Sequence, residues 1–191
     1  MTKVGIIGGS FDPIHSGHLI TANFVLEQRR LHKIIFIPCN ISPHKTQVVA
    51  AENNHRLEMV KLAIDNNPHF ECSDLEIQKG GISYTVETLK ELKNKFDEIE
   101  LIIGYDNLVT FDKWKDPDEI IKIAKLIVLR RSIGSRDIHT NKYYGEAIYV
   151  DTPIIEISSS EIRERVLKNL PIDYLVPEAV KKYIYKFNLY R

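Results

Sequence analysis

The sequence predicts an α/β protein built on a doubly wound, mostly parallel sheet with helices on both faces. Short apolar runs of strand length alternate with longer segments in which apolar residues recur at helical spacing. Such alternation is typical of right-handed strand–helix–strand units. At 191 residues, with no repeat, low-complexity tract or linker, the chain fits one substantial core. We therefore expect residues 1–191 to form a single domain, with the C-terminal helical part (about 158–191) packing on the sheet.

The expected strands are apolar runs rich in β-branched residues, as in strands covered on both faces. They span residues 4–7, 33–38, 70–77, 100–104 and 125–129, followed by a short pair at 148–150 and 154–157. Helix starts are indicated by capping residues, by proline and by apolar spacing. They lie after Gly17, at Asn53 or Asn54, at Ser83-Tyr84-Thr85, at Asp116-Pro117, at Ser158 and at Pro177. Residues 131–145 are polar and contain two glycines, which predicts a loop.

Composition excludes several classes of protein. Lysine plus arginine and aspartate plus glutamate number 26 each, which argues against a broad nucleic-acid or membrane surface but allows a local basic pocket. Cys39 and Cys72 match neither a zinc spacing nor a secreted disulfide framework. No apolar run approaches the ~20 residues that span a bilayer, and no signal peptide precedes the first strand. We expect a soluble cytoplasmic protein with no nucleic-acid partner and no membrane partner.

The stretch from Gly8 to His18, GGSFDPIHSGH, joins the first strand to the first helix. In an open α/β sheet, ligands bind at this kind of junction, beyond the carboxyl end of the strand. Gly8 and Gly9 allow the backbone to turn sharply and to approach a ligand closely. His15 and His18 fall around the first helical turn, where free N–H groups and the helix dipole attract phosphate. The stretch is neither a Walker A loop nor a GxGxxG fingerprint, and it predicts a polyanion site.

Further candidate residues follow other predicted strands, and so are expected at the same edge of the sheet. They are His44 and Lys45, Asp106, Trp114, and the helix start from Ser158 to Arg163. Each has a structural alternative: Lys45 and Arg163 as solvated surface charges, Ser158 as a helix cap, and Trp114 as a core residue. Their convergence on one edge favours a functional site.

The stretch from Gly8 to His18 resembles the signature of the HxGH nucleotidylyltransferases, a superfamily with a Rossmann-like fold. Nearly the whole chain resembles the bacterial nicotinate-nucleotide adenylyltransferase family. The matching segments are Pro43-His44-Lys45, Ser83-Tyr84-Thr85, Ile103-Gly104 with Asp106, Trp114, Ile157-Ser158-Ser159-Ser160 with Arg163, and Val176-Pro177 with Tyr183-Ile184. The chain departs from the family pattern at Ser42, Tyr105, Lys115 and Ser160, where the family usually has proline, a small residue, an aromatic residue and threonine.

The resemblance implies that ATP and nicotinate mononucleotide are joined to give deamido-NAD (nicotinate adenine dinucleotide) and pyrophosphate in NAD biosynthesis. It implies that His15, His18, Lys45 and Arg163 hold the phosphates and carry catalysis. ATP would also contact Gly8, Gly9, Ser10, Phe11, Asp106, Ser158 and Ser159. The acceptor would contact His44, Lys45, Thr85, Trp114 and Lys115. Mg²⁺ would arrive with ATP, because no carboxylate cluster suggests a metal site made by the protein alone. A homodimer is a family-level expectation.

The chemistry agrees with this interpretation. A phosphate monoester has a second pKa near ~6, so the acceptor is mostly dianionic at neutral pH and can attack directly, without a general base or a covalent enzyme intermediate. What it needs is charge screening by cations, and the histidines, Lys45 and Arg163 are expected to supply these together with Mg²⁺. Two alternatives remain. Phosphopantetheine adenylyltransferase shares the signature but typically has threonine at the position of His15 and no counterpart of Trp114. A nucleotide-binding sensor would keep the pocket without turnover.

Overall fold

The computed structural model describes residues 2–43, 51–130 and 141–191. Six strands form one sheet in the order β3-β2-β1-β4-β5-β6, and all neighbours pair in parallel. The strands are β1 (Lys3–Gly9), β2 (Lys33–Pro38), β3 (Phe70–Cys72), β4 (Glu98–Gly104), β5 (Lys125–Leu129) and β6 (Ala147–Val150). The strand order reverses between β1 and β4, so the crevice at their carboxyl ends is the topological switch point. The predicted doubly wound α/β fold is confirmed.

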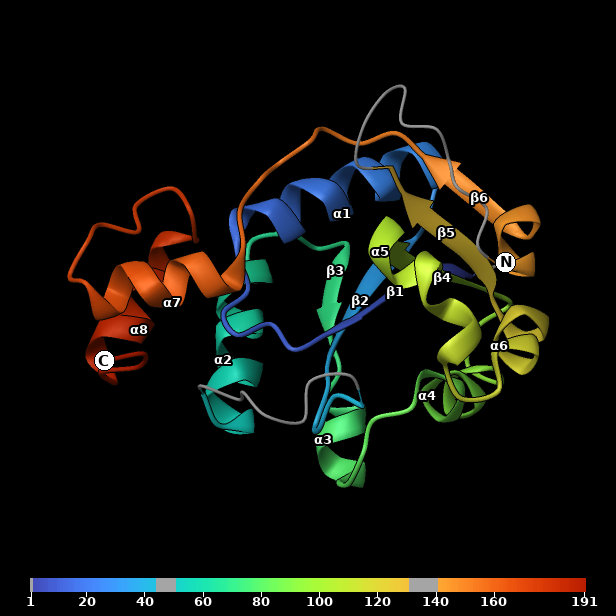
Figure 1. The fold of residues 1–191 in the computed structure, drawn as a ribbon, viewed down its shortest axis with the longest axis horizontal. Coiled ribbons are helices and arrows are strands. Elements are labelled where there is room, and N and C mark those ends of the chain that lie inside the picture. Colours follow the sequence, from blue (N-terminus) through green and yellow to red (C-terminus); the bar gives the residue numbers. More distant parts are fainter. Residues whose placement is uncertain (1, 44–50, 131–140) are drawn as a thin grey trace.

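Helices cover both faces of the sheet (Figure 1). The helices α1 (Ser16–Arg29) and α2 (Asn53–Ile64) pack on one face. The opposite core includes side chains of α4 (Thr85–Leu92), α5 (Tyr105–Val109) and α6 (Pro117–Ile123). Strand β2 serves both cores, because successive side chains point to opposite faces: Ile34 and Phe36 join the first core, and Ile35 and Ile37 the second.

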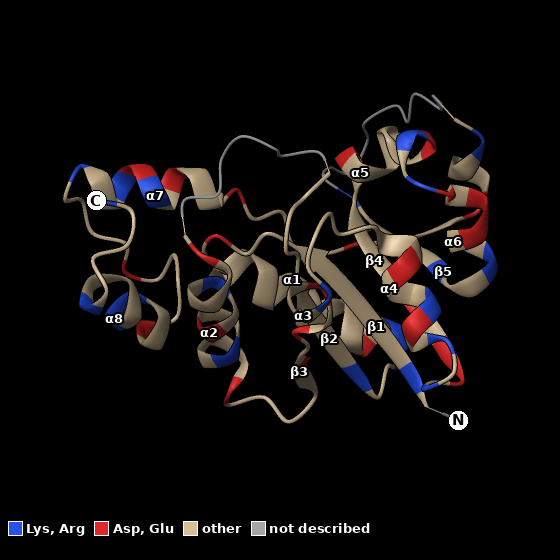
Figure 2. Ribbon diagram, turned by 90° about the horizontal axis from the view of Figure 1, so that it is seen from below, with Lys and Arg blue, Asp and Glu red and all other residues tan. Residues whose placement is uncertain are grey.

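The C-terminal helices continue the layer of α1 and α2. Helix α8 (Glu178–Lys186) packs against α2, and α7 (Ser159–Leu167) lies beside it, at the edge of the molecule farthest from β5 and β6 (Figure 1). Val180 and Ile184 are buried in the same core as Met59 of α2. Figure 2 shows basic and acidic residues interspersed along helices such as α4 and α7. Within the described ranges, every helix is too short or too polar to cross a lipid bilayer.

Two of the predicted strands, at 70–77 and at 154–157, differ from the structure. Strand β3 ends at Cys72, and residues expected to extend it form α3 (Leu75–Lys79). The cause is a tertiary contact: Glu76 is buried and accepts a 2.6 Å hydrogen bond from the Thr88 hydroxyl of α4, which draws the segment out of the sheet. Residues 154–157 form no strand, because β6 already occupies the edge beside β5 and Pro153 then leads the chain away toward α7.

The loop expected at 131–145 is also wrong at its end. Residues 131–140 lie outside the described ranges, but Lys142–Gly145 form a 3₁₀ helix, η2. Tyr143 and Tyr144 of this helix are buried against the second core. The average polarity of residues 131–145 predicts a loop, although two tyrosines of this segment belong to the core.

Of the predicted helix caps, the one at α7 forms with its side-chain hydrogen bond, and the one at α6 forms in position only. Ser158 accepts a 3.1 Å hydrogen bond from the backbone N–H of Glu161, as predicted. Neither Asn53 nor Asn54 caps α2: the N-cap is Glu52, and the Asn53 side chain bonds Arg56 and Asn40 instead. Asp116 is the N-cap of α6 and Pro117 the first helical residue, as predicted, but Asp116 has a left-handed φ of 48° and its side chain makes no capping hydrogen bond.

Candidate active site

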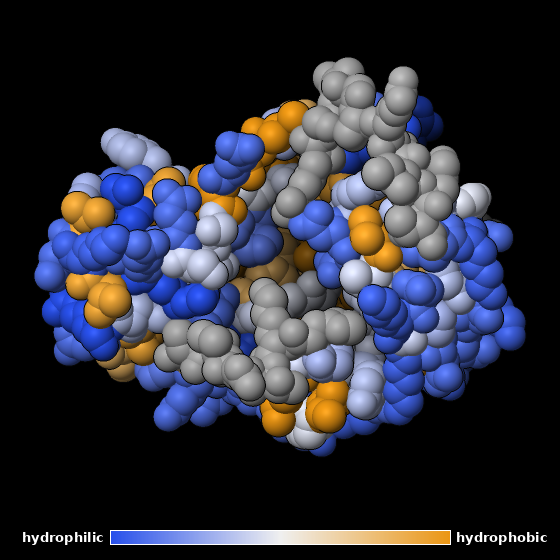
Figure 3. Space-filling view, in the orientation of Figure 1, coloured by the Kyte–Doolittle hydropathy of each residue, from blue (hydrophilic) through white to orange (hydrophobic). Residues whose placement is uncertain are grey.

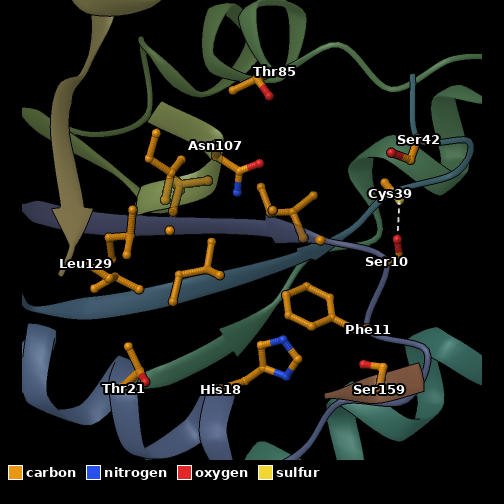
Figure 4. Close-up of a pocket in the computed structure, with 18 of the residues that line it drawn as sticks. Ser10, Phe11, His18, Thr21, Cys39, Ser42, Thr85, Asn107, Leu129 and Ser159 are labelled. Carbon is orange, nitrogen blue, oxygen red and sulfur yellow. Dashed lines mark hydrogen bonds between the residues drawn. The ribbon is translucent and has the colours of Figure 1, made fainter. Parts of the chain in front are cut away.

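A cavity of about 1360 Å³ opens at the carboxyl ends of β1, β4 and β5. Figure 3 shows it as a hollow in the face of the molecule, and Figure 4 shows side chains from several separate elements facing it. The signature loop, defined as residues 8–18, forms one side together with the start of α7. The start of α4 and the segment from Lys113 to Lys115 form the other. This volume exceeds the ~300–1,000 Å³ of most single-ligand pockets, so two ligands can fit side by side.

The signature loop is shaped by a buried ring. Phe11 has a left-handed φ of 48° and is buried, and its ring lies edge-on to that of His18 with centroids 5.2 Å apart. A Cβ atom added to Gly9 would lie 3.2 Å from this ring. Glycine at position 9 therefore leaves space for the Phe11 ring, which folds back under the loop and lies against His18.

The two histidines form one stacked unit at the start of α1. Their ring centroids lie 3.7 Å apart at an interplanar angle of 28°. His15 is the N-cap residue, and its backbone N–H donates to Nδ1 of His18 at 3.2 Å. A Cβ atom on Gly17 would lie 3.1 Å from Nδ1 of His15, so glycine at this position leaves space for the His15 ring.

Burial sets the protonation of His15. Desolvation lowers the pKa of His15 to about 4, so in the free protein its ring is neutral at pH 7. His15 thus differs from the cation expected from sequence, and it can offer one N–H donor rather than a full charge. Nδ1 of His18 accepts a hydrogen bond, so the N–H of its ring is at Nε2. An N–H at Nε2 suits a phosphate oxygen.

The C-terminal region is bonded to the signature loop. Arg163 of α7 donates to the Asp12 carbonyl at 2.8 Å, and Ser159 donates to the Pro13 carbonyl at 2.8 Å. The buried Asp12 carboxylate accepts a 2.8 Å hydrogen bond from the Tyr190 hydroxyl. Burial, followed by the neighbouring Asp12 charge, raises the pKa of Tyr190 well above its usual value, so the hydroxyl stays protonated and can donate. Arg163 and Ser159 therefore position the loop as well as bordering the cavity.

The opposite side of the cavity presents a helix start and an aromatic ring. Thr85 is the first residue of α4, and its side chain faces the cavity in Figure 4. Trp114 is half-buried and packs on Phe111 with ring centroids 5.1 Å apart. The Lys115 ammonium lies 4.3 Å from the centre of the Tyr84 ring and pairs with Glu87 at 2.6 Å.

The structure brings most of the predicted site residues to this one cavity. The lining includes Gly8, Gly9, Ser10, Phe11, His15, His18, Thr85, Trp114, Lys115, Ser158, Ser159 and Arg163. Asp106 is exposed in α5 and does not line it, whereas the next residue, Asn107, does (Figure 4). The reason is that α5 begins at Tyr105, so successive side chains point about 100° apart. His44 and Lys45 lie outside the described residues.

Sequence reasoning missed residues that support the cavity from behind. Arg56 is 1% exposed and donates to the carbonyls of Ser10 and Cys39. A signal existed: Arg56 precedes the core residues Met59, Val60 and Ile64 by three, four and eight positions, which places a charge on the buried face of α2. Tyr190 had no such signal, because its partner Asp12 lies 178 residues away in sequence.

The fold and the cavity at its switch point define a Rossmann-like protein of the nucleotide-binding class. The model of the cytidylyltransferase-like family matches residues 6–165. The probable nicotinate-nucleotide adenylyltransferase of Thermoanaerobacter sp. (strain X514) is 42% identical over 99% of this chain and 94% of its own length. The nicotinate-nucleotide adenylyltransferase of Bacillus subtilis (strain 168) is 41% identical over 100% of this chain and 99% of its own length. The chain therefore belongs to the cytidylyltransferase-like family and, within it, to the nicotinate-nucleotide adenylyltransferases.

A solved structure shows the same fold. The nicotinic acid mononucleotide adenylyltransferase of Plasmodium falciparum, in complex with NaAD, superposes with a TM-score of 0.80. The match covers 100% of this chain and 98% of that one, at 24% sequence identity. The architecture is thus shared over the full chain.

Proposed function

We propose that this protein transfers the AMP unit of ATP to the phosphate of nicotinate mononucleotide, releasing pyrophosphate and forming nicotinate adenine dinucleotide. The observation that carries the proposal is the single cavity at the switch point. It has the stacked histidines of the signature loop on one side, and Thr85 with Trp114 on the other. Family membership supports the same reaction.

On the ATP side, the proposed roles follow from hydrogen-bond chemistry. The backbone of Gly8 and Gly9, the Nε2–H of His18 and the Arg163 guanidinium border the space where a triphosphate would lie. These groups donate to phosphate oxygens and gain strength as negative charge gathers on the transferring group. The acceptor phosphate is already a nucleophile at neutral pH, so it displaces pyrophosphate directly. Neither His15 nor His18 is needed as a base.

Mg²⁺ is proposed to enter with ATP. The buried carboxylates at the cavity are committed elsewhere: Asp12 to Tyr190 and Glu76 to Thr88. In the described ranges, no group of three or more His, Cys, Asp or Glu side chains is arranged to hold a metal ion. A triphosphate can supply the oxygen ligands that Mg²⁺ prefers, and the ion neutralises its charge.

On the acceptor side, Trp114 offers an indole face to the pyridinium ring, and the first turn of α4 offers N–H groups to its carboxylate.

The test of the proposed function is to incubate the protein with ATP, Mg²⁺ and one acceptor at a time, and to measure pyrophosphate. The acceptors are nicotinate mononucleotide, nicotinamide mononucleotide and phosphopantetheine. Release with nicotinate mononucleotide is expected. Release only with phosphopantetheine, or ATP binding without any turnover, would replace the proposal by one of the two alternatives.

A further inference from the structure

Arg56 is the largest side chain that is fully buried in the described part of the protein. It lies in the first turns of α2, behind the cavity wall rather than in it. Across residues 2–43, 51–130 and 141–191, no carboxylate forms an ion pair with it. A buried guanidinium without a carboxylate is costly, so its hydrogen bonds indicate what it is retained for.

Those hydrogen bonds join two loops. One terminal nitrogen of Arg56 donates to the Ser10 carbonyl in the signature loop at 2.6 Å. The other donates to the carbonyls of Cys39 and Asn40, immediately after β2. The guanidinium is planar and its N–H donors point in fixed directions, so it can fix the distance and the angle between the two loops. A lysine ammonium has no such fixed geometry.

A second set of bonds extends from this guanidinium toward the acceptor side. Asn53 accepts from Arg56 and donates to the side chain of Asn40. The Asn40 backbone N–H donates to the Ser83 hydroxyl at 2.9 Å, directly before Tyr84 and α4. Arg56 is therefore connected through Asn40 to the helix start on the far side of the cavity.

We propose that Arg56 is a positioning residue for the reaction, holding the signature loop in register with the loop after β2 and with the start of α4. It touches no substrate and acts through Ser10 and Asn40. The positive charge of Arg56 is separated from the cavity by Ser10, which lines the cavity and accepts its hydrogen bond. From there the charge favours binding of a polyanion in the cavity. The role in turnover rests on the proposed function, whereas the role in ATP binding does not.

The test compares Arg56→Gln, which removes the charge and the fixed donor geometry, with Arg56→Lys, which keeps the charge alone. The matched control is Arg165→Gln, since Arg165 donates to the Pro171 carbonyl at 2.9 Å and lies away from the cavity. ATP affinity is measured by titration, and kcat and KM by pyrophosphate release, on preparations whose melting curves show folded protein at the assay temperature. Pyrophosphate release by the wild-type protein in the same assay tests the proposed function independently of Arg56.

For Arg56→Gln we expect ATP affinity and kcat each to fall at least about tenfold, with Arg56→Lys in between and Arg165→Gln within twofold of wild type. High salt should not remove the difference, because the group is buried. ATP affinity within threefold of wild type in folded Arg56→Gln would overturn the proposal. If Arg56→Gln does not fold, Arg56→Lys and Asn53→Ala decide: both should bind ATP at least threefold more weakly, and unchanged affinity in both would overturn it.

Discussion

The imidazole rings of His15 and His18 stack with centroids 3.7 Å apart, while the backbone N–H of His15 holds Nδ1 of His18 at 3.2 Å. Because Nδ1 of His18 accepts this hydrogen bond, the N–H group of its ring is at Nε2.

We predict that His18→Ala stays folded and binds ATP within about tenfold of wild type, about 1.4 kcal/mol. Turnover should fall by about 10²–10³, because the lost donor acts mainly in the transition state. Steady-state kinetics, ATP titration and thermal melting of one preparation check this; near-normal turnover would show that His18 has only a structural role.

Gly17→Ala tests the geometry of the same pair. The added methyl group would lie 3.1 Å from Nδ1 of His15, so the His15 ring must move by a few tenths of an ångström and its contact with His18 changes. We expect a clear loss of kcat with ATP still bound. Gly145→Ala is the matched control, because a Cβ there meets nothing within 4 Å. Equal activities of the two variants would show that the stacked arrangement is not needed for turnover.

The stability of the protein should depend on pH through His15. Burial lowers its pKa from 6.5 to about 4, so between these values the unfolded chain binds a proton that the folded protein does not. The free energy of unfolding should therefore fall as pH decreases from about 6.5 to about 4, by up to about 3 kcal/mol. Denaturant unfolding at pH 7 and pH 4.5 measures it. His15→Asn keeps an N-cap residue and should reduce the dependence; an equal dependence in His15→Asn would contradict this role of His15.

Trp114→Ala should raise the KM for nicotinate mononucleotide and leave the KM for ATP nearly unchanged. Stacking and the cation–π attraction of an indole for a pyridinium are worth about 0.5–2 kcal/mol. Trp114 also packs on Phe111, so Trp114→Phe serves as the control that keeps a ring there. An equal loss for both substrates in Trp114→Ala would assign the residue to the fold.

Nicotinate mononucleotide should be preferred over nicotinamide mononucleotide. The N-terminal turn of α4 favours an anion by about 0.3–2 kcal/mol, and the NH₂ group of a carboxamide would face donors there and leave them unpaired, at about 1–3 kcal/mol. These terms predict a ratio of specificity constants of at least about tenfold. Comparable constants for the two acceptors, from kinetics at saturating ATP, would contradict this assignment of Thr85 and α4.

The sequence predicts best those parts of the fold that depend on local pattern. The strands at 33–38 and 125–129 have the expected bounds, because a continuous apolar run follows directly from burial on both faces. The signature loop is likewise found where a strand passes into a helix. The segment after Cys72 is mispredicted because a distant partner, Thr88, decides where Glu76 lies.

The supporting residues of the site depend on such distant contacts. Arg56 and Ser10 are 46 residues apart, and Tyr190 and Asp12 are 178 apart, so no periodicity or motif relates them. Side-chain protonation is also invisible in sequence: the neutral state of His15 follows from burial that only the folded chain creates. Motifs thus locate the cavity, and packing determines how its groups are held.

The fate of the α-phosphate of ATP tests the central proposal most directly. The protein is incubated with nicotinate mononucleotide, Mg²⁺ and ATP labelled at the α- or the γ-phosphate, and the products are separated. We predict that the α-label appears in a dinucleotide and the γ-label in pyrophosphate, in equal amounts. Release of the γ-label as inorganic phosphate, or an α-label that stays in ATP or in free AMP, would contradict adenylyl transfer by this protein.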